Sequence, residues 1–449
     1  MIWRQSTEQV LSTFDISPHN GFLPSQLPLT VLPDAYYEPW ETLIGGLSGL
    51  LQRQQLVPAI HSLPILNTSR LKSEREWQRA YVILSFVTHA YIWGADRPSE
   101  ILPPQITVPY LQVARHLDLP PTATYAALNL WNFAPASSLS ELSVPENLRS
   151  LTTFTGTSDE AWFYLISVAM ESKGAEAIPL ALRCAEAISQ ESPERLPKIL
   201  QGIAQCIDEI GTLLERMYER CDPNVFYHQI RPFLAGSKGM AVAGLPQGVF
   251  YDEGEGKGRY HTYSGGSNAQ SSLIQFLDLV LGTEHHSTGA PSSKPSPSKA
   301  TGNPYIAEMR NYMPLPHRNF LSQIPQLLDL RTYATAATTP TIVREAYDRA
   351  VTSLTTFRNK HLTLVTRYII IPSRQQSSSS SALGKSGVEE KVNLATVSRI
   401  DTQESRDATF EAKAPVSEHE PQLQGTGGMD LMSFLKQTRD ETVEAKIGT

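Results

Sequence analysis

The sequence predicts an all-α fold. Apolar residues recur at three- and four-residue steps along most of the chain, which is the spacing of one helix face. Almost no segment alternates apolar and polar residues as a half-buried strand does, and there is no internal repeat. The chain has 449 residues, which is enough for two domains or for one domain with long appendages.

Helices are expected in most of the chain after an irregular start. The first part, up to about residue 60, is rich in proline and weakly periodic, which predicts an extended lead-in with short elements. Residues 197–220 show the clearest helix face, and Pro197 suits a first turn because its missing N–H costs nothing there. The other predicted helices are 76–94, 108–117, 122–133, 159–171, 175–189, 224–234, 267–281 and 341–371.

Two polar segments interrupt this pattern. Residues 283–303 are rich in proline, serine and lysine and predict a mobile surface insertion. Residues 373–424 begin with a serine run and stay polar, so they cannot bury enough apolar area to offset the entropy of ordering. Order is expected to resume at 429–439, in a short final helix that closes over something. Its apolar side chains are Leu431, Met432, Phe434 and Leu435.

Composition excludes several classes of protein. The net charge of −7 argues against a general nucleic-acid-binding surface. No apolar run approaches the roughly 18 residues that span a bilayer, and no signal peptide is apparent, so a cytoplasmic protein is expected. Cys184, Cys206 and Cys221 are too few and scattered for disulfides or a thiolate metal site. Cys206 lies on an apolar helix face, which predicts a buried structural thiol.

Few motifs indicate chemistry. The sequence contains no His-Glu-x-x-His, P-loop or nucleophile elbow. Residues 254–258 form a glycine-rich run, but acidic residues interrupt it and no apolar strand is expected before it, which argues against a nucleotide site. Of the 11 histidines, His285 and His286 in the insertion and His419 in the polar tail are expected to be solvated.

His361 is placed differently from the other histidines. On the predicted helix 341–371 it is the strongly polar group among apolar neighbours, and a buried imidazole needs a partner for each ring nitrogen. An axial haem ligand fits this setting, since imidazole suits iron and a porphyrin needs an apolar wall. The pattern alone favours the alternative, a core histidine bonded to a backbone carbonyl. The neighbours are Val351, Leu354, Phe357, Val365 and Tyr368.

Six stretches, in order along the chain, resemble indoleamine 2,3-dioxygenases of fungal type. They are LDLPP at 117–121, FYHQIR at 226–231, GGSNAQSS at 265–272, NYMPLPHRNFL at 311–321, FRNKHLTLVTRYIIIP at 357–372 and GTGGMDLM at 425–432. The resemblance runs from about residue 80 to the final helix. It implies two helical domains, a small one at 1–150 that covers the distal side of a haem and a large haem-binding one at 151–449. It also implies a substrate lid near 425–428.

The resemblance assigns a haem-binding side to the molecule. His361 is implied to be the proximal ligand of a haem b that is held without covalent attachment, since the chain has no Cys-x-x-Cys-His. Arg358 and Asp278 match the arginine and aspartate that tune this ligand. Taken by itself, Arg358 could be a surface cation. Ser267 matches a residue at the haem edge, next to glycines that permit a close approach.

A substrate side is implied as well. Phe226 and Tyr227 match residues that contact the indole, and Arg231 matches the one that holds the substrate carboxylate. From spacing alone this segment is ordinary packing. The resemblance further implies Ser167 over the distal face, Tyr125 at the back of the indole pocket and Thr426 on the amino-acid group. Three positions depart from the family pattern, and they are Tyr227, Ser237 and Asn268.

The implied activity is that of a haem-dependent dioxygenase. It would cleave the indole C2–C3 bond of L-tryptophan with O2 to give N-formylkynurenine, the first step of the kynurenine pathway of tryptophan catabolism and NAD biosynthesis. Its partners would be L-tryptophan or related indoleamines, O2 and a reductant, with no nucleic acid or membrane, and it would be a monomer. Two alternatives stay open: a haem protein of the same fold that binds or senses O2, and a helical scaffold that uses its tail for interactions.

Overall fold

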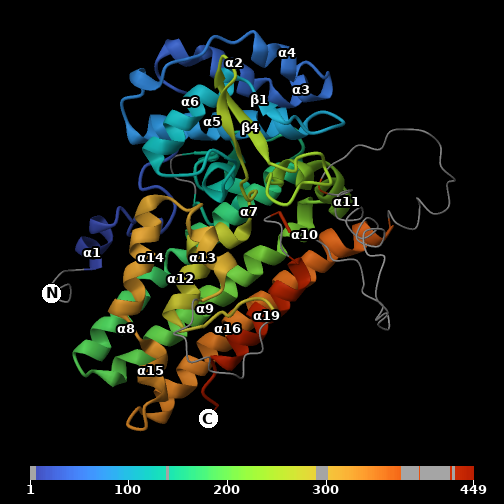
Figure 1. Ribbon diagram of the computed structural model, residues 1–449. Helices are drawn as coiled ribbons and strands as arrows, with labels where there is room; N and C mark the ends of the chain where they lie inside the picture. The colour runs from blue at the N-terminus through green and yellow to red at the C-terminus, as the bar shows by residue number, and fades with distance from the viewer. Residues whose placement is uncertain are drawn as a thin grey trace.

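The computed structural model describes residues 7–137, 141–289, 302–375, 394, 425–426 and 430–448. The predicted all-α class is confirmed, because helices form nearly all of the regular structure in these residues (Figure 1). None of the described helices is long and apolar enough to cross a membrane.

The N-terminal helices form a layer at one end of the molecule (Figure 1). Helix α5 is buried along most of its length, and its aromatic side chains pack against those of the shorter helices around it. The irregular lead-in contains short helical elements, as expected. The helices of this layer are α2 (Glu38–Gly45), α3 (Leu47–Gln52), α4 (Leu56–His61), α5 (Glu74–Trp93) and α6 (Pro104–Leu117). Helix α1 (Thr7–Thr13) lies outside the layer, beside the helix bundle below it (Figure 1).

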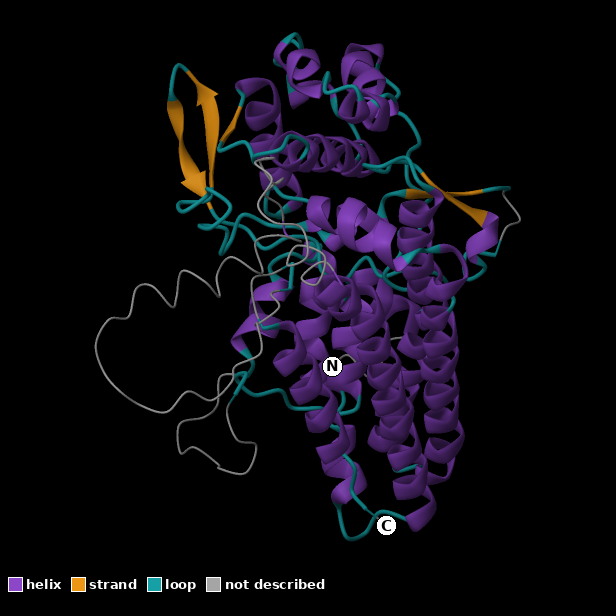
Figure 2. Ribbon diagram, turned by 90° about the vertical axis from the view of Figure 1, so that its right-hand side faces the viewer, coloured by secondary structure: helices purple, strands orange, loops and turns teal. Residues whose placement is uncertain are grey.

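The remaining helices form an elongated bundle below this layer (Figures 1 and 2). Its two longest members, α9 and α16, pack against each other. The helices of the bundle and its upper end are α7 (Ser158–Gly174), α8 (Ala177–Ser189), α9 (Leu196–Glu215), α10 (Met217–Arg220), α11 (Pro223–Val225), α12 (Ser272–Val280), α13 (Pro304–Arg310), α14 (Leu315–Leu327), α15 (Leu330–Thr335), α16 (Thr341–Val365) and α19 (Leu431–Glu444).

Three helical segments contain a wide π turn. These turns are Ala126–Leu130, Phe226–Ile230 and Thr366–Ile370, each within or at the end of a helix that the sequence predicts. A π turn holds one more residue than an α turn, so it changes which side chains share a face, and such turns often occur at functional sites.

Two small sheets lie on opposite sides of the upper layer in the view of Figure 2. One has the strand order β1–β4–β5, in which β1 is parallel and β5 antiparallel to β4, and the other is the antiparallel pair β2–β3. The strands are β1 (Ile101–Leu102), β2 (Phe133–Pro135), β3 (Leu148–Ser150), β4 (Val249–Gly254) and β5 (Lys257–His261).

The glycine-rich run 254–258 is the turn of the β4–β5 hairpin. The expectation that no strand precedes it is wrong, because β4 leads directly into it. Glu255 and Gly256 both have positive φ, 55° and 70°, as the tight turn of a two-residue hairpin requires. The run is therefore explained by backbone geometry, without any phosphate.

The buried side chains form two hydrophobic cores. The first core unites the N-terminal layer with parts of 154–168 and 217–251, and it includes Tyr368. The second core fills the bundle between α8, α9, α12, α14 and α16. The three cysteines are free and buried in these cores, as predicted for Cys206. The division of the chain at residue 150 stays a prediction.

Candidate active site

Two adjoining cavities lie where the two cores meet, with empty volumes of about 1070 and 1000 Å3. We call them together the central cavity. Most of its lining is apolar or aromatic. Each of the three π turns contributes to the wall of the second cavity, for example with Leu128, Phe226 and Ile369. Side chains that line both cavities are Tyr125, Phe163, Asn268, Ala269, His361, Leu364, Phe434 and Leu435.

His361 lines both halves of the central cavity from α16. Burial lowers the pKa of its imidazole to about 4, and the cation of Arg358 contributes to the decrease. The ring is therefore neutral at physiological pH. Among the described residues neither ring nitrogen has a hydrogen-bond partner, so the alternative of a core histidine bonded to a backbone carbonyl is not supported.

Arg358 and Asp278 lie beside His361 and line the first cavity. Arg358 is one helical turn before His361 on α16, and it donates a 2.5 Å hydrogen bond to Asp278 Oδ1 from α12. Burial by itself would raise the pKa of Asp278. Arg358 and His285 outweigh this effect and lower the pKa to about 2, so Asp278 is an anion.

The wall of the second cavity carries Phe226 and Arg231. The Phe226 ring meets Phe163 and Tyr368 edge-on, at centroid distances of 5.1 and 5.6 Å. Arg231 is 1% exposed and donates a 3.3 Å hydrogen bond to the carbonyl oxygen of Leu394. Burial lowers the pKa of Arg231 to about 10, so the guanidinium remains charged at neutral pH.

Tyr227 does not line the central cavity, in contrast to the expectation that it contacts the indole. Its ring is completely buried and lies under the guanidinium of Arg231, 5.4 Å from the ring centroid to the guanidinium carbon. The π turn at Phe226–Ile230 directs Phe226 into the cavity and Tyr227 behind it. Tyr227 therefore contacts Arg231 from behind the cavity wall and not the cavity itself.

A buried carboxyl group, which the sequence does not single out, lines the first cavity together with Ser167 and Tyr125. Glu171 Oε1 accepts hydrogen bonds from the hydroxyls of Tyr125, at 3.0 Å, and Ser271, at 2.7 Å. Its other oxygen has no partner among the described residues. Burial raises the pKa of Glu171 to about 7. The available signal was an acidic residue one turn after Ser167 on a mostly apolar helix.

The loop 265–267 borders the second cavity and holds the start of the predicted lid. The N–H of Gly265 donates to the carbonyl oxygen of Thr426 at 3.1 Å, and Ser267 and Thr426 both line the cavity. A side chain at Gly265 would have its Cβ 2.0 Å from the carbonyl oxygen of Leu234, so only glycine fits there. The lid residues 427 and 428 lie outside the described residues.

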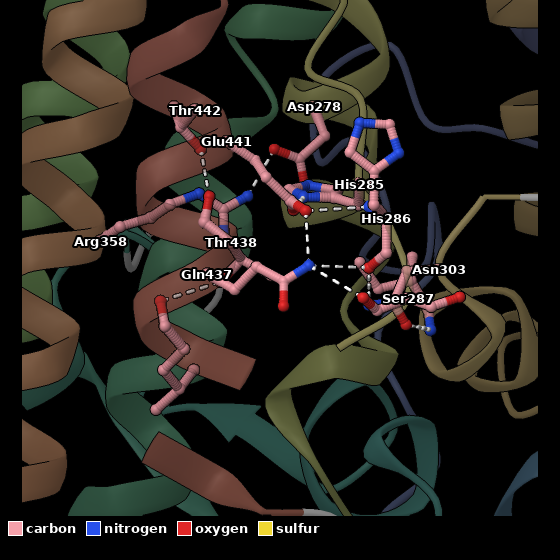
Figure 3. Close-up of polar contacts among 12 residues, drawn as sticks. Asp278, His285, His286, Ser287, Asn303, Arg358, Gln437, Thr438, Glu441 and Thr442 are labelled. Atoms are coloured by element: carbon pink, nitrogen blue, oxygen red, sulfur yellow. Dashed lines mark hydrogen bonds and ion pairs between the residues drawn. The ribbon is translucent and has the colours of Figure 1, made fainter. Parts of the chain in front are cut away.

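His285 is buried and charged, so its predicted exposure to solvent is wrong. Its Nδ1 lies 2.7 Å from Glu441 and its Nε2 lies 3.2 Å from Asp278 (Figure 3). His285 is buried because it pairs with two acidic residues, one of them distant in sequence, and the polar composition around residue 285 does not predict such partners. His286 is partly exposed, and His419 lies outside the described residues.

Helix α19 completes the cavity wall. Leu431, Phe434 and Leu435 line the cavity, which confirms that the final helix closes over something. Of the long polar stretch before it, the structure describes residues 373–375 and Leu394, and Leu394 is buried in the first core.

These residues fit a haem. The cavity offers a neutral imidazole with free ring nitrogens, a mostly apolar lining and a charged pair beside the imidazole. Imidazole is a preferred axial ligand of haem iron, and charged partners near it tune the ligand.

Comparison with known proteins identifies the family. The family model for indoleamine 2,3-dioxygenase matches residues 10–445. The chain is 40% identical to indoleamine 2,3-dioxygenase of Saccharomyces cerevisiae over 97% of its own length and 93% of the relative. It is 38% identical to indoleamine 2,3-dioxygenase qulI of Penicillium citrinum, over 97% and 88%. It is also 36% identical to 6-hydroxytryptophan 2,3-dioxygenase fscD of Fusarium equiseti, over 96% of both chains. The chain therefore belongs to the indoleamine 2,3-dioxygenase family and is an oxidoreductase.

Proposed function

We propose that this enzyme binds haem b through His361 and uses O2 to cleave the indole C2–C3 bond of L-tryptophan, giving N-formylkynurenine. The observation that carries the proposal is the neutral, unpartnered imidazole of His361 in a cavity whose wall also holds Phe226 and Arg231. When bound, the haem supplies the chemistry of O2 activation, and it needs an external reductant that keeps the iron ferrous.

The protein's own contribution is to position the substrate. Phe226, Phe163 and Tyr125 provide aromatic surface for an indole ring, and edge-to-face contacts favour such rings. Arg231 can hold the substrate carboxylate with its fork of donors, while Tyr227 packs under it and limits its movement. Holding two reactants in a fixed orientation removes much of the entropy cost of their reaction.

The remaining cavity residues complete the proposed site. Thr426 and Ser167 both line the cavity, and we propose that Thr426 contacts the amino-acid group of the substrate and Ser167 the distal side of the haem. Ser267 lines the second cavity and would help to hold the haem there. We further propose that the enzyme acts in the cytoplasm as a monomer.

A substituted tryptophan is a second candidate substrate, because one relative carries the name 6-hydroxytryptophan 2,3-dioxygenase. Steady-state turnover of haem-loaded, reduced protein should therefore be measured with both compounds and O2. We expect the ring-opened formyl product from L-tryptophan. Haem-loaded protein that yields no product from either compound would instead favour the O2-binding alternative, and protein without a Soret band would favour the scaffold.

A further inference from the structure

A line of four charged side chains joins α16, α12 and α19 at one side of the central cavity (Figure 3). Arg358 is hydrogen-bonded to Asp278 Oδ1, and Oδ2 of Asp278 lies 3.2 Å from Nε2 of His285. Nδ1 of His285 lies 2.7 Å from Oε2 of Glu441. We call Asp278, His285 and Glu441 the Glu441 clasp.

Hydrogen bonds to the main chain strengthen the clasp. Glu441 Oε1 accepts from the N–H of His286 at 2.9 Å and from the amide of Gln437 at 2.8 Å. The same amide donates to the carbonyl oxygens of His286 and Ser287, at 3.1 and 3.2 Å (Figure 3). Thus α19 binds the segment after α12 through the side chains of Gln437 and Glu441, which are one helical turn apart.

All members of the line are largely buried, with side-chain exposures of 13% for Arg358, 10% for Asp278, 7% for His285 and 3% for Glu441. Burial alone would lower the pKa of His285, but Asp278 and Glu441 raise it to about 9. At neutral pH the signs therefore alternate along the line, starting with the positive charge of Arg358. Buried charges are tolerated only when they are paired in this way, and removing one partner is costly.

The clasp is not a metal site. Its two carboxylates face opposite nitrogens of the His285 ring, so the three side chains do not converge on one point. No group of three or more metal-ligating side chains suitable for an ion occurs within the described part of the chain.

The clasp connects two parts of the cavity wall. Asp278 and Arg358 line the cavity beside His361, and Phe434, Leu435 and Thr438 of α19 line it from another side. Apolar contacts would be enough to dock a helix, and replacing buried ion pairs by apolar residues is often neutral or stabilising. A buried charge line that reaches the arginine next to His361 therefore indicates a role beyond docking.

We propose that His285 and Glu441 are positioning residues for the haem. They hold α19 against the cavity and set the charge balance at Asp278 and Arg358, and in this way they control haem retention and the reduction potential of the iron. This inference rests on the proposed function, because it requires a haem ligated by His361.

The test compares H285Q, E441Q and the double variant with two controls. H286Q changes the neighbouring histidine, whose main chain but not side chain takes part in the clasp, and E444Q removes an exposed acid from the same helix. The rate of haem transfer to an excess of apo-myoglobin and the midpoint potential of the iron are measured on each haem-loaded protein. Loss of an outer partner of a metal ligand typically weakens the site 10- to 100-fold, and we expect haem release to be about tenfold faster in either single variant.

The midpoint potential separates an electrostatic role from a structural one. H285Q removes a positive charge and should lower the potential, since the ferric state gains from a more negative surrounding. E441Q removes a negative charge and should raise it. The double variant removes both charges and should return toward the wild-type value, with a smaller effect on haem release than the sum of the single variants.

Haem release and potentials equal to those of the two controls would overturn the inference and leave the proposed function intact. Shifts of the same sign in both single variants would also overturn it, because they would indicate general loosening. If one single variant does not fold, the other single variant and the double variant still give the sign of the shift in midpoint potential. Wild-type protein that binds no haem through His361 would instead contradict the proposed function. The haem spectrum of the wild type shows this outcome before any variant is made.

Discussion

At the scale of single residues, the candidate site depends on side chains whose charge is decided by burial. His361 is neutral because its surroundings disfavour the imidazolium, and Arg231 stays charged although it is buried. The sequence could identify both only through the family resemblance, since a histidine on an apolar helix face and an arginine beside a core stripe have ordinary explanations. Glu171 and His285 escaped prediction because their partners come from distant segments.

Replacing His361 by alanine should abolish stable haem binding, because no other described histidine lines the central cavity. The Soret absorbance per protein after haem loading and gel filtration measures this. H116A, which changes an exposed histidine stacked on Trp77, is the control and should load haem normally. Unchanged haem content and spectrum in H361A would contradict the assignment.

Replacing Arg231 by alanine should weaken the use of L-tryptophan while haem stays bound. A hydrogen bond to a charged group contributes about 1.5–3 kcal/mol, so kcat/KM should fall by roughly 10- to 100-fold. R195A, at an exposed arginine, is the matched control. Undiminished turnover at low tryptophan concentration would remove Arg231 from the carboxylate role.

The carboxyl of Glu171 should make stability depend on pH. Burial raises its pKa from 4.5 to about 7 in the folded protein, so the folded state binds the proton more tightly than the unfolded state. This contribution is fully present below about pH 4.5 and is lost as the pH rises through 7. Urea unfolding of wild type and E171Q between pH 4.5 and 7 should show a weaker pH dependence in the variant, and equal slopes would refute this.

At the scale of elements, the sequence predicts long regular helices well and their interruptions poorly. The apolar spacing of 197–220 and 341–371 places α9 and α16 within a few residues. The sequence does not predict the three π turns, because five residues are too few to show a change in the spacing of apolar side chains. The β4–β5 hairpin is hard to predict because β5 is almost entirely exposed and polar, so its pairing with β4 leaves no alternation of apolar and polar residues in the sequence.

The docking of α19 should weaken at alkaline pH. His285 is faced by Asp278 and Glu441, with Arg358 beyond, and its pKa rises from 6.5 to about 9 on folding. The stabilisation is therefore fully present below about pH 6.5 and is lost as the pH rises through 9. Hydrogen exchange of α19 amides, corrected for intrinsic rates, should increase over this range in wild type, and H285Q should already exchange fast at pH 6.5. A protected α19 at pH 10 would be evidence against the clasp as its anchor.

At the scale of the whole molecule, the central cavity lies between the two cores. Tyr125, Phe226 and Tyr368 belong to the first core, while Leu214, Leu273 and Phe357 belong to the second. A haem in this place would contact both cores. Composition and periodicity could predict the helical class, but the place where the cores meet follows from packing between segments far apart in sequence.

Haem loading should stabilise the entire protein. A ligand that binds only the folded state adds RT ln(1 + [L]/Kd), about 2.7 kcal/mol at a free concentration of 100 Kd. The melting temperature of the wild type should therefore rise by several degrees on loading, with both cores unfolding in one transition. In H361A the increase should be absent. Two separate transitions in the loaded wild type would contradict a haem that bridges the cores.

Each of the three π turns holds one residue more than an α turn of the same chain path. Each residue of an α-helix advances by about 100° around the axis, so deleting one residue from such a turn would rotate everything after it by that angle. Deletion of His228, which does not line the cavity, would turn Arg231 away from the cavity although every side chain that lines it is kept. The lengths of these segments are therefore as much a part of the site as the residues that line it.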